Sequence, residues 1–394
     1  MKTTADVVVV GGGIIGCSVA RELARRSFDV VLVERHEIAA GASGRNHGLV
    51  FYPQDPRTES LYRQSFSIYR ELATGELDLA FDERPRGFIV MVSDESEWAA
   101  AELEAKACAV GGVSIHEMTA DDVRREEPNV APLLGGWFID DGYRLDPAVL
   151  TLAMALDARS AGADVNTHID VKSVITHHGK VSGVATDQGI VSAPMVVDAA
   201  GPWAPKLARS VGVNLAISGA RGWLLLTEAL DPIANHLLES SGWHLTAGDP
   251  GPQRTSLATY ADESSRPVTD IGLLIQQNRT GHVLLGGSRI PSLRDDPEGH
   301  DVTLEIARRA VTAIPMLADV GVSAVWSGVR PMSRDGLPLI GKVGGIEGLF
   351  IAGGHGGQGV MLGAGSARLL AEIITEETHF TDATDFDPSR ASLA

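Results

Sequence analysis

The sequence predicts an α/β fold (α+β overall), in which a Rossmann-like domain carries an inserted domain with an antiparallel sheet. The first observation is a βαβ unit at the N-terminus. It consists of a β-branched run at residues 6–10, a glycine-rich turn, a helical stretch and a second apolar run at residues 30–33. Continuous apolar runs are typical of parallel strands that are buried on both faces. The second observation is a set of short alternating strands later in the chain, which is the pattern of antiparallel sheets.

The remaining elements follow from periodicity and from capping signals. Thr119 is expected as an N-cap, and Pro147 stands in the first turn of a helix that Gly162 ends. Helices are expected at residues 59–79, 95–110, 119–126, 146–161, 303–313 and 359–376. Strands are expected at residues 88–92, 171–176, 181–186, 190–193, 195–199, 273–277, 282–286 and 348–352.

This order implies that the chain leaves one α/β domain and re-enters it, because strand–helix pieces alternate with mixed β material. The Rossmann-like domain is expected to be discontinuous, and the inserted pieces form the second domain. The predicted ranges are 1–85, 145–215 and 325–394 for the first domain, and 86–144 and 216–324 for the second.

Composition excludes several classes of protein. The 33 basic and 51 acidic residues give a net charge of −18, which disfavours binding to nucleic acid or to an anionic membrane. The last 23 residues carry six acidic side chains and one arginine, which predicts a solvated, frayed C-terminus. Two cysteines are too few for a disulfide framework or a metal–thiolate cluster, and no metal site is predicted. With no secretory leader or apolar span evident, we expect a cytoplasmic protein without a membrane segment.

A dinucleotide-binding motif opens the chain. Gly11, Gly13 and Gly16 form a G-x-G-x-x-G pattern between a predicted strand and a predicted helix. Such glycines allow a tight turn, a close approach of the backbone to a pyrophosphate, and close packing of the helix on the strand. Glu34 ends the next strand, where a carboxylate can accept hydrogen bonds from ribose hydroxyls. The motif leaves open which dinucleotide binds.

Glycines are concentrated in two stretches of the chain. Residues 11–48 hold seven and residues 328–365 hold thirteen of the 44 glycines, which favours two backbone cradles for one long cofactor. Within the first stretch, residues 41–48 form a polar loop that could close over a pyrophosphate or a flavin ring.

The order of these motifs resembles the superfamily of D-amino-acid oxidase, glycine oxidase and sarcosine oxidase, which are FAD-dependent amine oxidoreductases. The resemblance covers nearly the whole chain. It is carried by VVVVGGGIIGCSVARELA at the start, GASGRNHGLV (41–50), VVDAAGPWAP (196–205), VRPMSRDGLPLIG (329–341) and LFIAGGHGGQGVMLGAG (349–365). The stretch LLIQQNRTGHVLLGGSR (273–289) is most similar to D-proline or hydroxyproline dehydrogenases, opine dehydrogenase β subunits and hydrogen cyanide synthase subunits.

The resemblance implies an FAD-binding domain, an inserted substrate domain, and a set of residues around FAD. These are Gly11, Gly13, Ile14, Ile15, Gly16, Glu34, Arg35, Ala42, Ser43, Gly44, Arg45, Asn46, His47, Gly48, Leu49, Val171, Ala200, Gly201, Trp203, Gly354, His355, Gly356, Gly357, Gln358, Gly359, Val360 and Met361. The resemblance further implies that the helix beginning at Gly359 stabilises negative charge on the reduced flavin.

Three residues are candidates for catalysis: Arg330, His47 and His355. The resemblance assigns Arg330 to the carboxylate of the substrate, and a guanidinium binds a carboxylate bidentately. The alternative is an arginine that pairs with a structural acid such as Asp335. For the two histidines, a packing or hydrogen-bonding role stands beside a catalytic one.

Some positions differ from the family pattern. Gly357 and Met361 stand where some glycine and sarcosine oxidases carry Arg and Lys, so two carboxylate anchors are missing. Arg45 stands where related dehydrogenases carry a histidyl-flavin, and no cysteine lies in the last third of the chain. We therefore expect non-covalent FAD.

The expected reaction is oxidation of the C–N bond of an amino acid or a secondary amine. Hydride passes from Cα to flavin N5, and water then hydrolyses the imine. Candidate substrates are a D-amino acid, D-proline or hydroxyproline, an opine, or an N-methyl amino acid, with O₂ or a redox partner subunit as the electron acceptor. Two alternatives stay open: a subunit of a hetero-oligomeric dehydrogenase that passes electrons to a partner, and a flavin-dependent 2-hydroxy-acid dehydrogenase. A non-catalytic FAD-binding scaffold is the interpretation that the sequence favours least.

Overall fold

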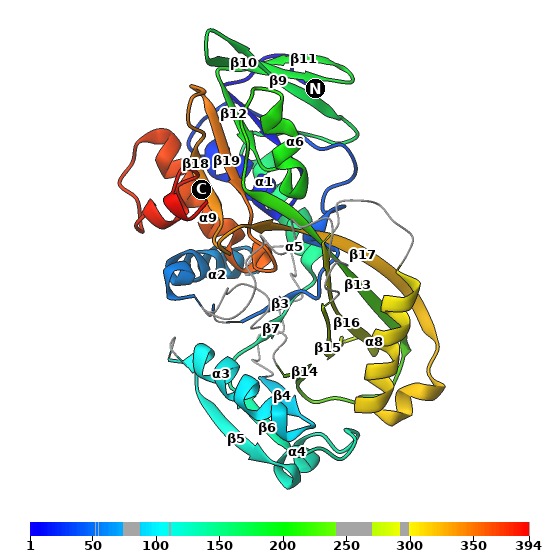
Figure 1. Ribbon diagram of the computed structural model, residues 1–394. Helices are drawn as coiled ribbons and strands as arrows, with labels where there is room; N and C mark the ends of the chain where they lie inside the picture. Colours follow the sequence, from blue (N-terminus) through cyan, green and yellow to red (C-terminus); the bar gives the residue numbers. More distant parts are fainter. Residues whose placement is uncertain are drawn as a thin grey trace, which may run out of the picture.

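The computed structural model describes residues 1–51, 53, 55–73, 87–109, 112–241, 270–291 and 299–393. Two large sheets organise these residues, one in the upper and one in the lower part of the molecule in Figure 1. None of the helices in the described ranges combines the length and the hydropathy that crossing a bilayer requires.

The upper sheet has six strands. Their order is β18 (Leu339–Lys342), β19 (Leu349–Gly353), β12 (Met195–Asp198), β1 (Val7–Val10), β2 (Val30–Val33) and β8 (Asp164–Asn166). All neighbours are parallel except β18 and β19, which pair antiparallel. Strands β1 and β2 are entirely buried, as their apolar runs predict. The sequence prediction of a Rossmann-like sheet is confirmed.

Helices cover one face of this sheet and a small sheet covers the other. The helices are α1 (Ile14–Arg25), α2 (Glu59–Ala73), α5 (Pro147–Ser160) and α9 (Gly359–Thr375). The small sheet consists of β9 (Val171–His177), β10 (Lys180–Thr186) and β11 (Gly189–Ser192), with α6 (Ala204–Arg209) nearby. Each side has its own apolar core, so the central sheet is buried on both faces.

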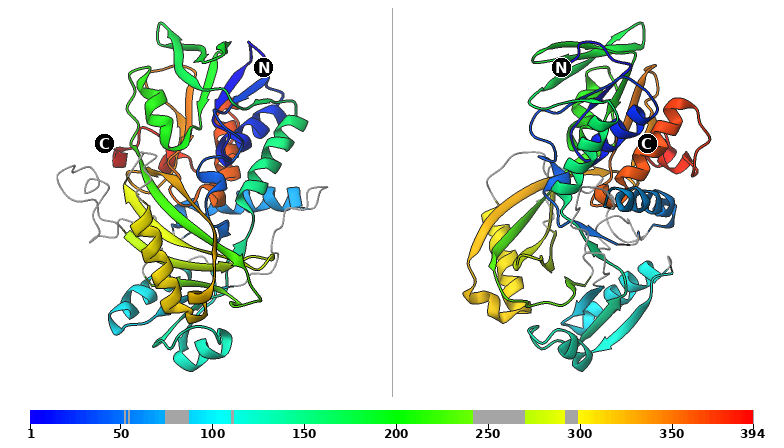
Figure 2. Two further views of the ribbon diagram at one scale, coloured as in Figure 1. Left: turned by 90° about the vertical axis from the view of Figure 1, so that its right-hand side faces the viewer. Right: turned by 180° about the vertical axis from the view of Figure 1, so that it is seen from behind.

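The lower sheet has eight strands. Their order is β17 (Val322–Ser333), β13 (Ile217–Ala229), β16 (His282–Pro291), β15 (Asp270–Gln277), β14 (Leu237–Ser240), β4 (Phe88–Val92), β6 (Gly135–Ile139) and β5 (Ile115–Thr119). All pairs are antiparallel except β14 with β4. Helix α8 (His300–Ala313) packs against β15 and β16, and Figure 2 shows it on the outer side of the sheet.

Smaller elements complete the chain. Helices α3 (Trp98–Ala109) and α4 (Ala120–Glu126) lie beside β5 and β6, and β3 (Leu49–Val50) pairs with β7 (Tyr143–Arg144). Short 3-10 turns occur at Ala42–Gly44, Pro56–Thr58, Glu95–Glu97, Gly201–Trp203, Pro315–Asp319, Thr384–Phe386 and Ala391–Leu393.

Most predicted elements appear with bounds that differ by a few residues. Thr119 caps α4 through a capping box with Asp122, and Pro147 opens α5, as predicted. The predicted end of α2 at residues 74–79 lies outside the described residues, and so does residue 110 at the end of α3. The sequence analysis missed the long strands β13 and β17. Both contain Gly and Arg, and β17 contains Pro331, which weakens their strand signal.

The prediction of a frayed C-terminus is wrong. The Arg390 guanidinium donates to both carboxylate oxygens of Asp335 at 2.7 Å, and both side chains are largely buried. This bidentate ion pair fixes the end of the chain against the turn before β18.

We propose that the two large sheets are the cores of the two predicted domains. Their strands alternate along the chain, which fits a discontinuous domain with insertions. The predicted boundary at residue 325 falls inside β17, so this strand joins the two parts.

Candidate functional site

One cavity of about 460 Å³ lies where the two large sheets meet, within the range of roughly 300–1,000 Å³ that small-molecule and cofactor sites occupy. Every residue of the predicted cofactor and catalytic set lines this cavity except Gly16, Gly44, Gly48 and Gly354. The two glycine-rich stretches of the sequence therefore meet at a single site.

The four glycines that do not line the cavity support the site by close packing. A Cβ at Gly16 would overlap the carbonyl oxygen of Gly11, so only glycine lets α1 lie this close to β1. Gly48 has φ +70°, and a Cβ there would overlap the carbonyl oxygen of Leu145. The sequence pattern identified these positions, and the structure places them behind the cavity wall.

The N-terminus of α1 opens into the cavity. Its N-cap residue Gly13 has no side chain, and a Cβ there would stand 2.9 Å from Ser43 Oγ. Ser43 Oγ accepts a hydrogen bond of 2.9 Å from the backbone N–H of Ile14. The helix dipole, the first N–H groups and a hydroxyl therefore face the same space, which is the pattern of a phosphate site.

Glu34 lies at the end of β2 with its carboxylate held by the backbone. One oxygen accepts from Gly12 N at 2.7 Å and the other from His36 N at 2.8 Å. Each oxygen keeps a second lone pair, so the carboxylate can also accept from ribose hydroxyls.

Three further residues of the predicted cofactor set, Arg35, Trp203 and Val171, also line the cavity. The guanidinium of Arg35 stacks 3.8 Å above the ring of Trp203, a cation–π contact that fixes both side chains. Val171, at the start of β9, is the third of these residues.

The polar loop at residues 41–48 is held by its own side chains. Asn46 Nδ2 donates to the carbonyls of Ala42 and Ser43, and its Oδ1 accepts from Gly48 N at 2.7 Å. Arg45 Nη1 donates to the carbonyl of Ser327 on β17 at 3.1 Å. The loop is therefore ordered against the larger sheet and does not merely connect two elements.

The N-terminus of α9 faces the same cavity. Its N-cap, Gln358, makes no side-chain capping bond with the described residues, and Gly359, Val360 and Met361 line the cavity. Gly356 has φ +57°, and its N–H donates to the carbonyl of Pro331 at 2.8 Å. The second helix dipole is thus also aimed at the site.

These residues fit FAD. Two helix N-termini, whose N-cap residues make no side-chain capping bond with the described residues, suit anionic groups. Glycines leave room where a Cβ would obstruct, and Glu34 suits a ribose. No group of three metal-ligating side chains is arranged for a metal ion in the part of the chain that the structure describes.

Arg330 lies on β17 and reaches across the sheet. A Cβ at Gly222 of β13 would overlap Arg330 Nη1, and Nη1 donates to the carbonyl of Ser288 on β16 at 3.0 Å. Arg390 donates to both oxygens of the Asp335 carboxylate, so this acid has another arginine as its partner.

The two candidate histidines differ in their surroundings. His355 is buried, its Nε2 lies 3.0 Å from Ser366 Oγ, and burial lowers its pKa to about 3. A neutral imidazole favours the packing and hydrogen-bonding role for His355. His47 packs against β16, where a Cβ at Gly286 would stand 3.1 Å from its Nε2.

The sequence analysis missed two buried arginines of the cavity, Arg221 on β13 and Arg289 on β16. Arg221 Nη1 donates to Ser327 Oγ at 2.6 Å. Arg289 is the last residue of the LLIQQNRTGHVLLGGSR stretch. Its position at the end of this motif was the signal in the sequence that could have identified it.

Comparison with known proteins agrees with this geometry. The hydrogen cyanide synthase subunit HcnC of Pseudomonas protegens is 26% identical over 99% of this chain and 97% of its own length. A glycine oxidase of Pseudomonas aeruginosa is 28% identical over 97% of this chain and 98% of its own length. The solved structure of glycine oxidase from Bacillus cereus has a TM-score of 0.81 at 25% identity, covering 99% of this chain and 100% of that one.

The family model described as FAD dependent oxidoreductase matches residues 6–373, which include both helix N-termini, Glu34 and Arg330. FAD is therefore the cofactor of this fold, and the sequence prediction of an FAD enzyme is confirmed. This chain belongs to the FAD dependent oxidoreductase family.

Proposed function

We propose that this chain oxidises the C–N bond of an amino acid or a secondary amine and transfers two electrons to FAD. The observation that carries the proposal is Arg330, a partly buried guanidinium in the cavity that holds both helix N-termini. Relatives named glycine oxidase and D-amino acid dehydrogenase, and a solved structure named iminodiacetate oxidase, support this substrate class.

Arg330 binds and orients the substrate carboxylate. Its backbone is stiffened by Pro331, and its Nη1 bond to the Ser288 carbonyl holds the guanidinium in place. A guanidinium remains charged when water is excluded, so it positions a carboxylate in an enclosed site better than an ammonium does. FAD, when bound, supplies the acceptor for the hydride that leaves the substrate carbon.

The apolar wall excludes water from the reacting carbon. Leu224 of β13 and Leu274 of β15 line the cavity and are both largely buried. Both pair with Gly286 of β16, so they flank this glycine on the two neighbouring strands. Exclusion of water strengthens the charge pairing with Arg330.

The experiment that tests the proposal is anaerobic mixing of the holoenzyme with D-amino acids, D-proline, D-hydroxyproline, opines and N-methyl amino acids. Loss of flavin absorbance with at least one substrate is expected, and no bleaching across the panel would refute C–N oxidation.

Acid precipitation is expected to release the flavin into the supernatant, because we propose non-covalent binding.

Substitution of Arg330 gives a sharper test. Arg330→Gln is expected to lower kcat/KM by about 10²–10³-fold, since a charge-assisted bidentate pair contributes roughly 3–4 kcal/mol in an enclosed site. Arg308→Gln is the matched control, because Arg308 is an exposed guanidinium on α8 that pairs with Glu305. Equal activity of both variants would remove Arg330 from the substrate site.

A second candidate function is a redox subunit that passes electrons to a partner chain. The observation in its favour is the similarity to HcnC, which is named as a synthase subunit, over 99% of this chain. Rapid peroxide formation by the isolated chain would argue against an obligatory partner. Substrate-reduced flavin that persists in air would support one.

The hydroxy-acid alternative requires a histidine to take the hydroxyl proton. His355 is poorly suited, since its pKa is about 3 and Ser366 holds its Nε2. Unchanged turnover of His47→Ala would dismiss this alternative.

A further inference from the structure

We propose that Gly222 is a positioning residue for the substrate. The missing side chain at this point of the eight-stranded sheet lets the Arg330 guanidinium lie against the sheet, in a fixed place from which it meets a carboxylate. The inference rests on the proposed function, in which Arg330 binds the substrate carboxylate. It adds a residue that carries no reactive group and acts through Arg330.

Gly222 lies inside β13, and Gly328 of β17 stands directly opposite it in the antiparallel register. Both glycines line the cavity. Glycine weakens the interior of a strand and often marks a point that another group approaches closely. Since opposite residues of an antiparallel pair share one face of the sheet, the two glycines form a single stretch of cavity floor without side chains.

Space, and not backbone conformation, is what requires glycine at this position. The φ angle of Gly222 is not among the positive ones, so alanine could adopt this backbone. A Cβ at Gly222 would, however, overlap Arg330 Nη1 and stand 2.9 Å from the Ser288 carbonyl oxygen. These two atoms are the donor and the acceptor of one hydrogen bond of 3.0 Å. An added methyl group would therefore occupy the space that this bond needs.

Of the two obstructed groups, the guanidinium is the one that can move. Ser288 belongs to β16, which is held between β13 and β15, and its hydroxyl accepts from Trp223 N at 2.9 Å. Arg330 Nη1 is the far end of a long side chain with several rotatable bonds. We therefore expect a Cβ at Gly222 to displace the guanidinium and to leave the sheet in place.

The cofactor loop contacts the same floor beside Arg330. Arg45 Nη1 donates to the Ser327 carbonyl at 3.1 Å, and Trp326 Nε1 donates to the Arg45 carbonyl at 3.3 Å. A Cβ at Gly328 would stand 3.1 Å from Arg45 Cβ. One pair of opposite glycines thus lies under both Arg330 and the cofactor loop, so the floor sets the separation between the substrate carboxylate and this loop.

The physical consequence concerns alignment as well as affinity. A guanidinium that has lost its fixed place binds a carboxylate in more than one orientation, and a misplacement of about 1 Å can lower a rate by roughly 10²-fold. Gly222→Ala is therefore expected to weaken carboxylate binding and to slow flavin reduction, while a ligand without charge is unaffected.

The binding test compares an inert carboxylate with its uncharged amide. The holoenzyme is titrated with butyrate and with butyramide, and affinity is read from calorimetry and from the flavin spectrum. Wild type is expected to bind butyrate at least tenfold more tightly than butyramide. Gly222→Ala is expected to reduce this ratio below threefold, with butyramide affinity and flavin content unchanged. Gly321→Ala is the matched control and is expected to keep the wild-type ratio, since a Cβ there would lie 3.5 Å from the Glu228 carboxylate, an ordinary contact.

A double-mutant cycle with Arg330→Met separates an effect through Arg330 from general damage to the sheet. Methionine ends before the Cζ and Nη1 atoms that a Cβ at Gly222 would contact. In this background Gly222→Ala is expected to change kcat/KM less than threefold, against at least tenfold in the wild-type background. If Gly222→Ala alone does not fold, the double variant is expected to fold, because the obstructing side-chain atoms are gone.

An undiminished preference for butyrate in Gly222→Ala would overturn the inference. So would an equal loss of kcat/KM in both backgrounds, or a double variant that also fails to fold, because Gly222 would then act on the sheet itself. Each of these results leaves C–N oxidation intact. Wild type that binds butyrate and butyramide equally would instead remove the role of Arg330, and no flavin reduction across the amine panel would overturn the proposed function.

Discussion

Asp198 ends β12 with its carboxyl fully buried, close to the backbone that leads into the cavity wall. One oxygen accepts from Ala200 N at 3.0 Å, and burial raises the pKa of this carboxyl to about 7. The folded chain therefore binds a proton on Asp198 at pH values where the unfolded chain, with its ordinary pKa near 3.8, does not.

This shift predicts a dependence of stability on pH. Between about pH 4 and pH 7 the folded state holds more protons than the unfolded state, so the contribution of Asp198 to stability falls as pH rises. The total fall is at most on the order of 4 kcal/mol, and it is complete above pH 7. Asp198→Asn is expected to flatten this part of the profile, because an amide does not titrate. Denaturant unfolding of both proteins at pH 5 and pH 8 checks it. A constant difference between the two proteins at both pH values would contradict the assignment.

Cys17 illustrates how burial limits chemistry at a single residue. It lies in α1 and is fully buried, and burial raises the pKa of its thiol to about 12. The thiolate is the reactive form, so Cys17 is expected to resist alkylation in the folded protein.

At the scale of elements, α9 is the helix that brings the second glycine cradle to the site. It packs on both α1 and α2 through small residues. A Cβ at Gly365 would overlap the backbone carbonyl of Leu61 on α2, and Gly365 N donates to Ser65 Oγ at 2.8 Å. The two helix axes are therefore as close as a glycine allows.

Gly365→Ala is expected to lower stability in spite of the better helix propensity of alanine. The obstructing atoms belong to the backbone of α2, so the helices must separate, and overpacking of this kind costs about 1–3 kcal/mol. Thermal unfolding of the holoenzyme measures the loss. Gly344→Ala is the matched control, since no atom lies within 4 Å of a Cβ at that position. A Tm for Gly365→Ala equal to that of the control would show that the helices adjust without cost.

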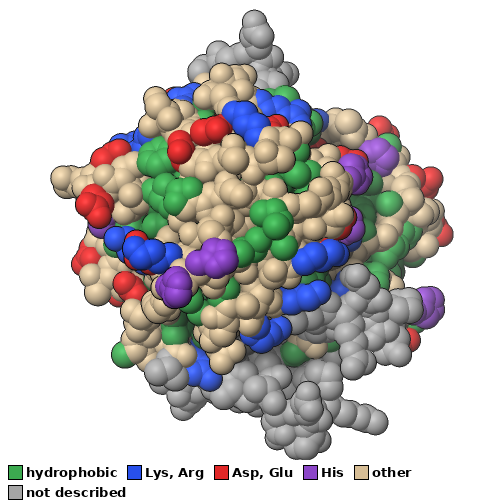
Figure 3. Space-filling view, turned by 90° about the horizontal axis from the view of Figure 1, so that it is seen from above, with side chains coloured by type: hydrophobic (Ala, Val, Ile, Leu, Met, Phe, Trp, Pro, Cys, Tyr) green, Lys and Arg blue, Asp and Glu red, His purple; other side chains and the backbone are tan. Residues whose placement is uncertain are grey.

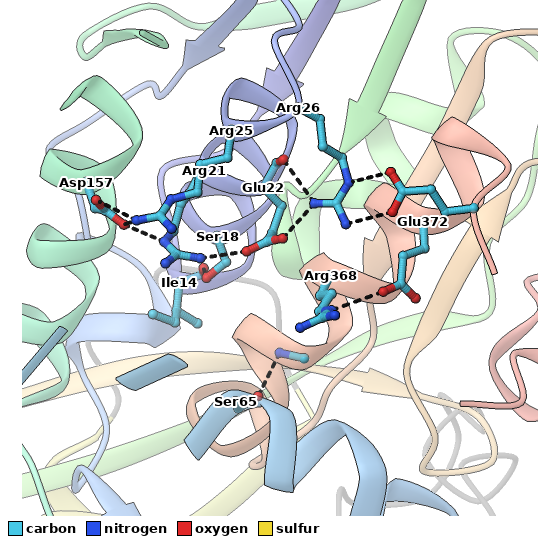
Figure 4. A network of polar contacts seen from close by, with 12 residues as sticks. Ile14, Ser18, Arg21, Glu22, Arg25, Arg26, Ser65, Asp157, Arg368 and Glu372 are labelled. Carbon is cyan, nitrogen blue, oxygen red and sulfur yellow. Dashed lines mark hydrogen bonds and ion pairs between the residues drawn. The ribbon is translucent and has the colours of Figure 1, made fainter. Parts of the chain in front are cut away.

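At the scale of the whole molecule, a network of ion pairs joins segments far apart in the chain (Figure 4). Arg21 of α1 is 3% exposed and donates to Glu22 at 2.6 Å and to Asp157 of α5 at 2.5 Å. Arg26 connects Glu22 to Glu377, 351 residues away, just after α9. The helix that opens at the cofactor is thus held by both α5 and the C-terminal segment.

Removal of one partner of this network is expected to destabilise the fold. Asp157→Ala leaves the buried Arg21 with a single acid, and loss of a charge-assisted hydrogen bond costs about 1.5–3 kcal/mol. Denaturant unfolding at low and high salt measures the change. Asp29→Ala is the control, because Asp29 and Lys2 are about half exposed, and only a small change is expected. Equal effects of the two substitutions would mean that the burial of Arg21 has no energetic consequence.

Surface charge also belongs to this scale. Acidic and basic side chains are both exposed on the face shown in Figure 3, while the chain as a whole is strongly acidic. In our proposed function, the positive charge that binds the substrate carboxylate is that of Arg330 in the cavity.

The parts of the fold that the sequence predicts are those with a local signal. Apolar runs identify β1, β2, β12 and β19, because a strand buried on both faces needs apolar residues at every position. Glycines at Gly11 and Gly13 identify the cofactor cradle, because backbone approach to a phosphate excludes a Cβ. The long strands β13 and β17 lack such a signal, and their pairing with each other supplies the order that their residues do not encode locally.

By itself, the sequence determined the Rossmann-like unit and the dependence on FAD. It also predicted that both glycine-rich stretches line one site, and it predicted the role that we propose for Arg330. Only the tertiary structure decided which arginines line the cavity and which acids pair with other arginines. It brings Arg330 Nη1 to the Ser288 carbonyl of β16, and it pairs Asp335 with Arg390. The physical reason is that a cradle depends on backbone conformation, which neighbouring residues set. A charge pair depends on strand register and sheet order, which bring distant residues together.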